Sequence, residues 1–362
     1  MYILRDKYRL EKTIGQGGMG KVYLATDLST NKLVAIKESI ITGKSSENKI
    51  RRLQREFYFM TRIKNPYIVR GLDFFDLENR YFIVMEYIEG ITLKKLIHNY
   101  PHSIPFEKQL KIAQQICKAI IALNDHDIIH RDIKPSNIVL QGKNATPKIL
   151  DLGIAKAING ELESITKLSV IGTPQYMAPE QINKSFKISK STDVFALGAL
   201  FYQFFSWSQQ SPFYAKDTIA IMKKVINFHP PLLTFDSPHK FFVAEIIDMA
   251  LQKEREYRIS SVKTMLDMLL KYIPVTPKIS SPTNNAVDTI ILKSIHSKNN
   301  IPTSQNNKQS PIQTPMLRTS RYKKNIEKKK QNIAKKKQNE IILGFVISLL
   351  VSIIILYFLR LR

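Results

Sequence analysis

The run HRDIKPSN at residues 130–137 is the feature of this sequence that most constrains its fold. Short apolar runs flank it on both sides, so we expect a polar loop held on a buried frame, the setting in which catalytic groups concentrate. Asp132 can accept a proton from a hydroxyl, Asn137 can ligate a cation through its amide oxygen, and Lys134 adds a positive charge between them. This combination suits the charge that develops in phosphoryl transfer, and a solvated charged loop is the alternative interpretation.

A glycine-rich segment, GQGGMG at residues 15–20, lies between two runs that alternate as strands do, at 8–14 and 21–26. Glycines let backbone N–H groups approach phosphate oxygens, because no Cβ stands in the way. The same glycine spacing occurs in dinucleotide-binding turns, but those require a helix directly after the glycines. Here β-branched Val22 and aromatic Tyr23 follow, which favours a strand–loop–strand arrangement.

Four further motifs follow along the chain. Lys37 ends the strand-like run LVAI, where a lysine that simply reaches water is the alternative interpretation. Residues 50–63 predict an amphipathic helix that contains Glu56. Asp151 follows the run KIL and opens the triplet Asp-Leu-Gly, and Ala178-Pro179-Glu180 closes the polar stretch that comes after it.

These motifs occur in one order, and together residues 8–271 resemble the eukaryotic-type (Hanks-type) serine/threonine protein kinases. The family usually has Asp-Phe-Gly where this chain has Asp-Leu-Gly, which leaves open whether Leu152 packs inward. The form GQGGMGKVY of the glycine loop and an apolar segment near the C-terminus resemble the bacterial membrane-anchored branch. Many members of that branch carry extracellular sensor domains after the membrane segment, and we expect this chain to lack them.

The resemblance implies an α+β, two-lobed protein kinase fold. A small antiparallel-sheet N-lobe with one helix binds the nucleotide, and a mainly helical C-lobe carries the catalytic and substrate-binding groups. We place the N-lobe at residues 1–87 and the C-lobe at 88–272, with helices predicted at 216–227 and 241–271. A disordered linker at 273–317, a basic juxtamembrane segment at 318–340 and one transmembrane helix at 341–359 complete the expected organisation.

The resemblance also implies ATP and a divalent metal, Mg²⁺ or Mn²⁺, as cofactors. In such a site Lys37, held by Glu56, orients the α- and β-phosphates. Glu47 is the competing carboxylate, but it precedes the apolar pattern of the predicted helix. Asn137 and Asp151 then hold the metal.

In the same site Asp132 takes or orients the hydroxyl proton, and Lys134 neutralises charge on the moving phosphoryl group. Lys134 also suits Ser/Thr rather than Tyr substrates. The nucleotide is expected to contact the glycine loop, the strands beside it and the segment after the apolar run YFIVM. The expected nucleotide contacts are Ile14, Gly15, Gln16, Gly17, Gly18, Met19, Gly20, Lys21, Val22, Ala35, Lys37, Glu86 and Ile88.

Other residues are assigned supporting roles by the same resemblance. Asp193 is expected to brace the catalytic loop, and Arg258 to form a buried bridge with Glu180. A phosphate in the activation segment could pair with Arg131 and order that segment. The candidate phosphosites are Ser164, Thr166 and Ser169, and ordinary loop hydroxyls are the alternative for each.

The last quarter of the chain is strongly basic and ends in an apolar run. Residues 273–362 hold 16 Lys/Arg and 3 Asp/Glu, within a chain of net charge +25. Residues 341–359 carry no charge, and a helix of that length at about 1.5 Å per residue nearly spans a hydrocarbon core of about 30 Å. The heavier basic flank precedes this run, so we expect a single-pass anchor in the cell membrane with the catalytic domain in the cytoplasm.

Composition bounds the remaining partners. Gly344, Ser348 and Ser352 repeat every four residues, which would let two anchors pack as a homodimer, with chance spacing as the alternative. The basic segment at 318–340 has one aromatic residue, Tyr322, so no nucleic-acid partner is expected. Cys117 is the only cysteine and lies in an apolar helical pattern, which predicts a buried thiol in a reducing compartment.

The main alternative function is a membrane-anchored pseudokinase scaffold that binds partners and transfers nothing. Loss of any of four residues would favour that function, and all four are present: Lys37, Asp132, Asn137 and Asp151. A dinucleotide-binding enzyme is excluded more firmly. That class requires a helix directly after the glycines, which this sequence does not predict, and it leaves the HRD run unexplained. The sequence therefore favours a kinase that uses ATP, acts on protein Ser/Thr acceptors and lies at a lipid bilayer.

Overall fold

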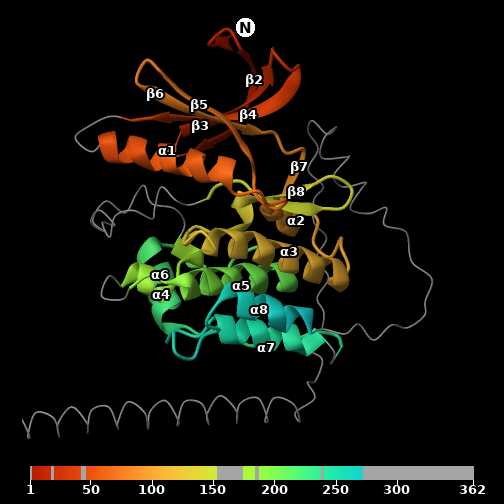
Figure 1. Ribbon diagram of the computed structural model, residues 1–362. Helices are drawn as coiled ribbons and strands as arrows, with labels where there is room; N and C mark the ends of the chain where they lie inside the picture. The colour runs from red at the N-terminus through yellow and green to blue at the C-terminus, as the bar shows by residue number, and fades with distance from the viewer. Residues whose placement is uncertain are drawn as a thin grey trace, which may run out of the picture. The chain divides into compact units, whose positions relative to one another are not determined.

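The computed structural model describes residues 2–17, 20–41, 46–152, 174–183, 187–237 and 240–271. Most strands lie before residue 90, and helices dominate the described residues after that point (Figure 1). The predicted two-lobed α+β architecture is confirmed. The expected linker, basic segment and membrane span all lie outside the described residues. None of the helices within the described ranges is long and apolar enough to cross a membrane.

A six-stranded antiparallel sheet forms the N-lobe, in the order β1-β2-β3-β4-β6-β5. A cluster of buried side chains, among them Tyr8, Ile36 and Phe82, packs on one face of this sheet. The glycine loop is the turn of the β2–β3 hairpin, as predicted, with Gly17 paired to Gly20. The strands are β1 Ile3–Leu4, β2 Tyr8–Gly17, β3 Gly20–Asp27, β4 Lys32–Ile40, β5 Gly71–Leu77 and β6 Arg80–Glu86.

Helix α1, Ser46–Arg62, lies beside the sheet (Figure 1). Leu53, Glu56 and Met60 are buried at helical spacing, so the carboxylate of Glu56 lies on the apolar face. At Gly71, at the start of β5, an added Cβ would lie 3.0 Å from Cβ of Met60, so α1 packs tightly against β5 at this point. This close packing fixes the height of Glu56 relative to the strands.

A second, three-stranded sheet carries the polar motifs of the C-lobe. It consists of β7 Gly90–Thr92, β8 Ile138–Gln141 and β9 Thr146–Ile149, all antiparallel. The catalytic loop and the short helix η1, Pro135–Asn137, lead directly into β8, and Asp151 follows β9. The hairpin β8–β9 therefore brings Asn137 and Asp151, both predicted metal ligands, to the same end of one sheet.

Helices build the rest of the C-lobe, with α3, α5, α7 and α8 stacked against one another (Figure 1). Helix α5 is buried on all sides, whereas the others bury one face. Cys117 is fully buried on α3 as predicted, and burial raises the pKa of its thiol, which makes it inert. The helices are α2 Leu93–Asn99, α3 Phe106–Asn124, η4 Pro174–Tyr176, α4 Pro179–Ile182, α5 Lys190–Ser206, α6 Thr218–Asn227, α7 Phe241–Ala250 and α8 Val262–Leu270.

The predicted helical range 241–271 holds two helices, α7 and α8, joined by a loop that the sequence pattern did not indicate. That loop carries Arg258, which is only 3% exposed and bonds to carbonyls of the loop itself. An unbroken helix would carry this guanidinium away from those acceptors.

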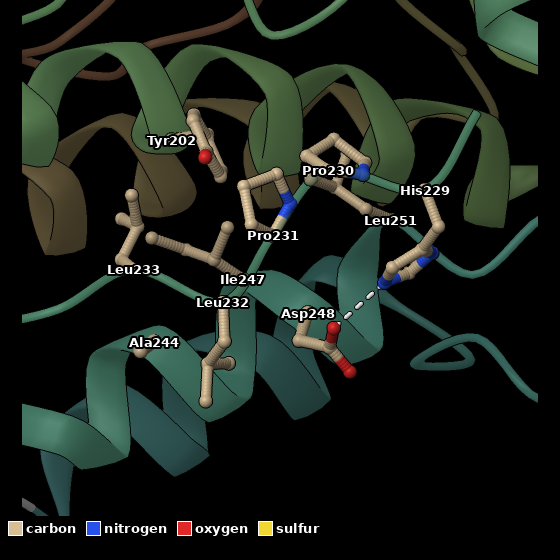
Figure 2. Close-up of a pocket in the computed structure, with 10 residues that line it drawn as sticks. All are labelled: Tyr202, His229, Pro230, Pro231, Leu232, Leu233, Ala244, Ile247, Asp248 and Leu251. Carbon is tan, nitrogen blue, oxygen red and sulfur yellow. Dashed lines mark hydrogen bonds and ion pairs between the residues drawn. The ribbon is translucent and has the colours of Figure 1, made fainter. Parts of the chain in front are cut away.

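A small apolar hollow lies between α5, α7 and the segment that joins α6 to α7 (Figure 2). Pro230, Pro231 and Leu232 line it, and His229 Nε2 meets Asp248 Oδ1 at 2.7 Å on its edge. None of the predicted site residues lines this hollow. It belongs to the packing of the C-lobe and not to the site described below.

Candidate active site

The catalytic loop is fixed from beneath by Asp193 of α5. Its carboxylate accepts hydrogen bonds from the backbone N–H of His130, at 3.0 Å, and of Arg131, at 3.1 Å. Arg131 has a left-handed backbone, with φ of 63°, and these bonds help to hold that conformation. Burial raises the pKa of Asp193, and the donated N–H bonds oppose that shift. The predicted brace is confirmed.

Asp132, Lys134 and Asn137 converge at the mouth of this loop. Lys134 Nζ lies 2.9 Å from Asp132 Oδ2, and Asn137 Nδ2 donates to the Asp132 backbone carbonyl at 3.0 Å. The Asn137 amide also reaches Asp132 Oδ2 at 3.3 Å. The carboxylate is therefore held in one orientation by its neighbours, which is what a base that must meet a hydroxyl requires.

Lys37, Glu56 and Asp151 form a second cluster that joins the two lobes. Lys37 Nζ lies 3.0 Å from Glu56 Oε1 and 3.7 Å from Asp151 Oδ2. Glu56 is 1% exposed, whereas Glu47 is 85% exposed beside Arg51, so the choice of Glu56 as partner is confirmed. Burial disfavours the ammonium, but Asp151 and Glu56 outweigh it and raise the pKa of Lys37, which therefore stays charged.

The Asp-Leu-Gly triplet keeps the inward packing that the more usual phenylalanine would provide. Leu152 is fully buried in the main core, and Leu150 N donates to the Asn137 carbonyl at 2.9 Å. The open question about Leu152 is thus settled for this chain. The backbone bond also ties the approach to Asp151 to the catalytic loop.

The donors at the lobe junction suit a metal that is shared with a nucleotide. Within the described ranges no group of three or more His, Cys, Asp or Glu side chains could hold a metal by itself. Mg²⁺ is usually bound by one or two carboxylates together with substrate phosphates, so Asp151 and the amide oxygen of Asn137 fit it when a nucleotide completes the shell. The Asn137 nitrogen already bonds to Asp132, which leaves the oxygen as the ligating atom.

The expected nucleotide contacts lie on the β2–β3 hairpin, on β4, and at or just after the end of β6. Gly20 has φ of 127°, and an added Cβ would lie 1.8 Å from the Glu38 carbonyl oxygen, so no other residue fits there. Ala35 and the side chain of Ile88 are buried, and Val22 packs against the main core. Ile14, Gln16, Gly17 and Lys21 are exposed, Gly15 is half-buried, and Gly18 and Met19 lie outside the described residues.

Glu86, the last residue of β6, is more constrained than we predicted. Its N–H donates to the Arg70 carbonyl at 3.0 Å, so an adenine base would use its carbonyl instead. Its side chain accepts from Lys148 at 2.7 Å, a partner that sequence reasoning missed. The only local signal was a lysine within an apolar strand three residues before Asp151.

The end of the activation segment is anchored by a buried bridge. Arg258 donates to Glu180 at 2.8 and 3.1 Å, and Thr192 Oγ1 donates to Glu180 Oε1 at 2.9 Å, which confirms the predicted pair. Gln181, which sequence reasoning also missed, donates to the Arg131 carbonyl at 3.0 Å. The candidate phosphosites Ser164, Thr166 and Ser169 lie outside the described residues.

A two-lobed fold with a strand lysine, a helix glutamate and an Asp/Asn pair at the lobe junction defines the protein kinase class. Comparison with known families agrees, since the model of the "Protein kinase domain" family matches residues 8–276. The chain belongs to the protein kinase family.

Three of the curated relatives that the chain matches come from bacteria. The chain is 31% identical over 266 residues to the "Probable serine/threonine-protein kinase PknB" of Lactococcus lactis, covering 73% of this chain and 42% of the relative. It is 34% identical over 233 residues to "Serine/threonine-protein kinase pkn3" of Myxococcus xanthus, covering 62% and 42%. PknB of Mycobacterium tuberculosis is 30% identical over 288 residues, covering 76% and 45%. The chain thus spans less than half the length of these relatives.

Proposed function

We propose that this chain is a serine/threonine protein kinase that transfers the γ-phosphoryl group of ATP to hydroxyl groups of proteins, its own among them. The observation that carries the proposal is the convergence of Lys37 with Glu56 and Asp151, whose carboxylate oxygens lie 3.0 and 3.7 Å from Lys37 Nζ. In the same chain the catalytic loop holds the Asp132 carboxylate in one orientation. The names of the relatives, all serine/threonine kinases, support the choice of acceptor.

The residues divide the work of transfer. The Lys37 ammonium, kept charged by its two carboxylates, binds and orients the α- and β-phosphates. Asp151 and Asn137 would hold Mg²⁺, and the bound metal would neutralise charge on the phosphates. Asp132 orients the acceptor hydroxyl and accepts its proton, while Lys134, 2.9 Å away, stabilises negative charge on the transferring group.

The alternative of a pseudokinase scaffold has no structural support in the described residues. A scaffold has no need for an ion pair between Lys37 and a fully buried Glu56, because burying a charged pair costs desolvation energy. Here that pair is formed and aligned with Asp151. The geometry therefore favours phosphoryl transfer.

The deciding experiment uses the full chain with radiolabelled ATP, Mg²⁺ and a generic Ser/Thr protein substrate, beside its Asp132→Asn variant. Loss of a general base lowers the rate by about 10²- to 10⁴-fold, so the variant should be almost unlabelled. Equal labelling by both proteins would remove Asp132 from its role. Label mapped only to tyrosine would overturn the Ser/Thr assignment.

We also propose that the chain is anchored in the cell membrane by residues 341–359, with the kinase domain in the cytoplasm. The uncharged run and its basic N-terminal flank support this.

The small-residue repeat at Gly344, Ser348 and Ser352 supports pairing of two anchors. A variant ending at residue 340 should leave the membrane fraction, and Gly344→Leu with Ser348→Leu should lower crosslinked dimer while membrane association persists. A truncated variant that stays in the membrane would end the proposal.

A further inference from the structure

One ion pair joins elements of the two lobes beside the proposed site and has no role in the mechanism above. Lys148 Nζ on β9 lies 2.7 Å from Glu86 Oε1 at the end of β6, and the two side chains are only 12% and 28% exposed. The same Oε1 accepts the N–H of Arg70 at 2.9 Å, while the Arg70 carbonyl accepts the N–H of Glu86 at 3.0 Å. Glu86 is thus held on both its backbone and its side chain.

The strand that carries Lys148 also leads to the metal-binding end of the site. Ile149 N donates to the Tyr67 carbonyl and Val69 N to the Ile149 carbonyl, both at 2.9 Å, so β9 is bonded to the segment just before Arg70. Leu150 N then bonds to Asn137, and Asp151 follows. Lys148 therefore stands between the backbone that faces the adenine and the two residues that hold the metal.

We propose that Lys148 is a positioning residue that couples the adenine end of the ATP site to its metal end. The inference rests on the proposed function, since it assumes that ATP binds at Glu86 and Asp151. Removing the ammonium leaves a partly buried carboxylate without its charge partner, and Glu86 then turns toward water. That movement releases Arg70 N and loosens the end of β6, whereas the backbone bonds of β9 to residues 67–69 remain. The adenine end of the site is then no longer held in position relative to the metal end.

The test measures binding of Mg·ATP and of adenosine to the full chain by calorimetry, for wild type, Lys148→Met and Lys148→Arg. Lys148→Met keeps the stem but not the charge, and it should weaken Mg·ATP about tenfold, as loss of a partner outside the direct ligands does at metal sites. Adenosine, which has no phosphate to reach the metal, should lose less. Lys148→Arg should recover most of the Mg·ATP affinity.

Lys190→Met is the matched control, because Lys190 pairs with an Asp127 that is 93% exposed. It should leave both affinities unchanged. Unchanged Mg·ATP affinity in Lys148→Met would overturn the coupling, and so would equal losses of affinity for Mg·ATP and adenosine. A lowered unfolding midpoint with intact affinity would assign Lys148 to stability alone. A wild-type chain that binds Mg·ATP but labels no substrate would instead defeat the proposed kinase activity and leave this comparison standing.

Discussion

At the scale of single residues, the buried carboxylate of Glu56 is the most informative side chain. It is 1% exposed, and its Oε1 meets Lys37 Nζ at 3.0 Å. Lys37 also faces Asp151 and so has two carboxylates to align it. Glu56 therefore acts by orienting the Lys37 ammonium, and the ammonium in turn determines where a phosphate binds.

Replacing Glu56 by Gln should lower kcat/KM for ATP by about tenfold to a hundredfold, since a hydrogen bond to a charged group contributes about 1.5–3 kcal/mol. Glu47→Gln on the same helix is the control, because that side chain is 85% exposed, and it should change kcat/KM by less than the error of the assay. Steady-state kinetics of both variants measures the difference. Similar losses in the two variants would mean that α1, rather than the ion pair, determines activity.

At the scale of elements, the Glu180–Arg258 bridge joins α4 to the loop between α7 and α8. The Arg258 guanidinium also donates to the Gln252 carbonyl of that loop. The Thr192 hydroxyl of α5 donates to Glu180, so the bridge includes α5 as well. Burial opposes the Glu180 charge, but the Arg258 bonds outweigh it and lower the pKa of that carboxyl below 4.5. The stability it contributes is therefore present above about pH 4.5 and is lost as the pH falls through the lowered value.

Glu180→Gln should lower the free energy of unfolding by about 3–5 kcal/mol at neutral pH, because it leaves Arg258 buried without a counter-charge. The gap between wild type and variant should shrink as the pH falls below about 4.5, where the wild type loses the same charge. Urea unfolding at several pH values measures it. Glu254 is an exposed residue of the same loop, so Glu254→Gln should unfold with the same free energy as the wild type. A difference in unfolding free energy for Glu180→Gln that does not change with pH would point to packing rather than charge.

Prediction from the sequence succeeded where chemistry is carried by contiguous motifs. The catalytic loop and the glycine hairpin each depend on residue types that only a few structures tolerate, as the space around Gly20 illustrates. The Glu180–Arg258 pair, 78 residues apart in sequence, was predicted only through the family resemblance. It failed where a contact depends on strand pairing between distant segments. Lys148 meets Glu86 only because β9 bonds to residues 67–69, and no local pattern around either residue indicates that register.

At the scale of the whole molecule, the predicted ligand contacts come from both lobes. The glycine hairpin, Lys37 and Glu86 belong to the first sheet, whereas Asn137 and Asp151 flank the β8–β9 hairpin. Lys37 and Asp151 are 3.7 Å apart, so a bound nucleotide and its metal would contact both lobes at once. A ligand that binds only the assembled pair of lobes stabilises their folded arrangement by mass action.

Mg·ATP at about a hundred times its Kd should therefore stabilise the full chain by about 2.7 kcal/mol, seen as a rise in its thermal unfolding midpoint. Chelation of the metal should remove most of that rise, since Asp151 and Asn137 then have no cation to hold. In Asp151→Asn, ATP should raise the unfolding midpoint by the same amount with and without Mg²⁺. The control is Asp127→Asn, whose side chain is 93% exposed in the wild type, and it should behave as the wild type. A full metal-dependent rise in Asp151→Asn would place the metal elsewhere, and no rise in the wild type would mean that the two lobes do not share a nucleotide.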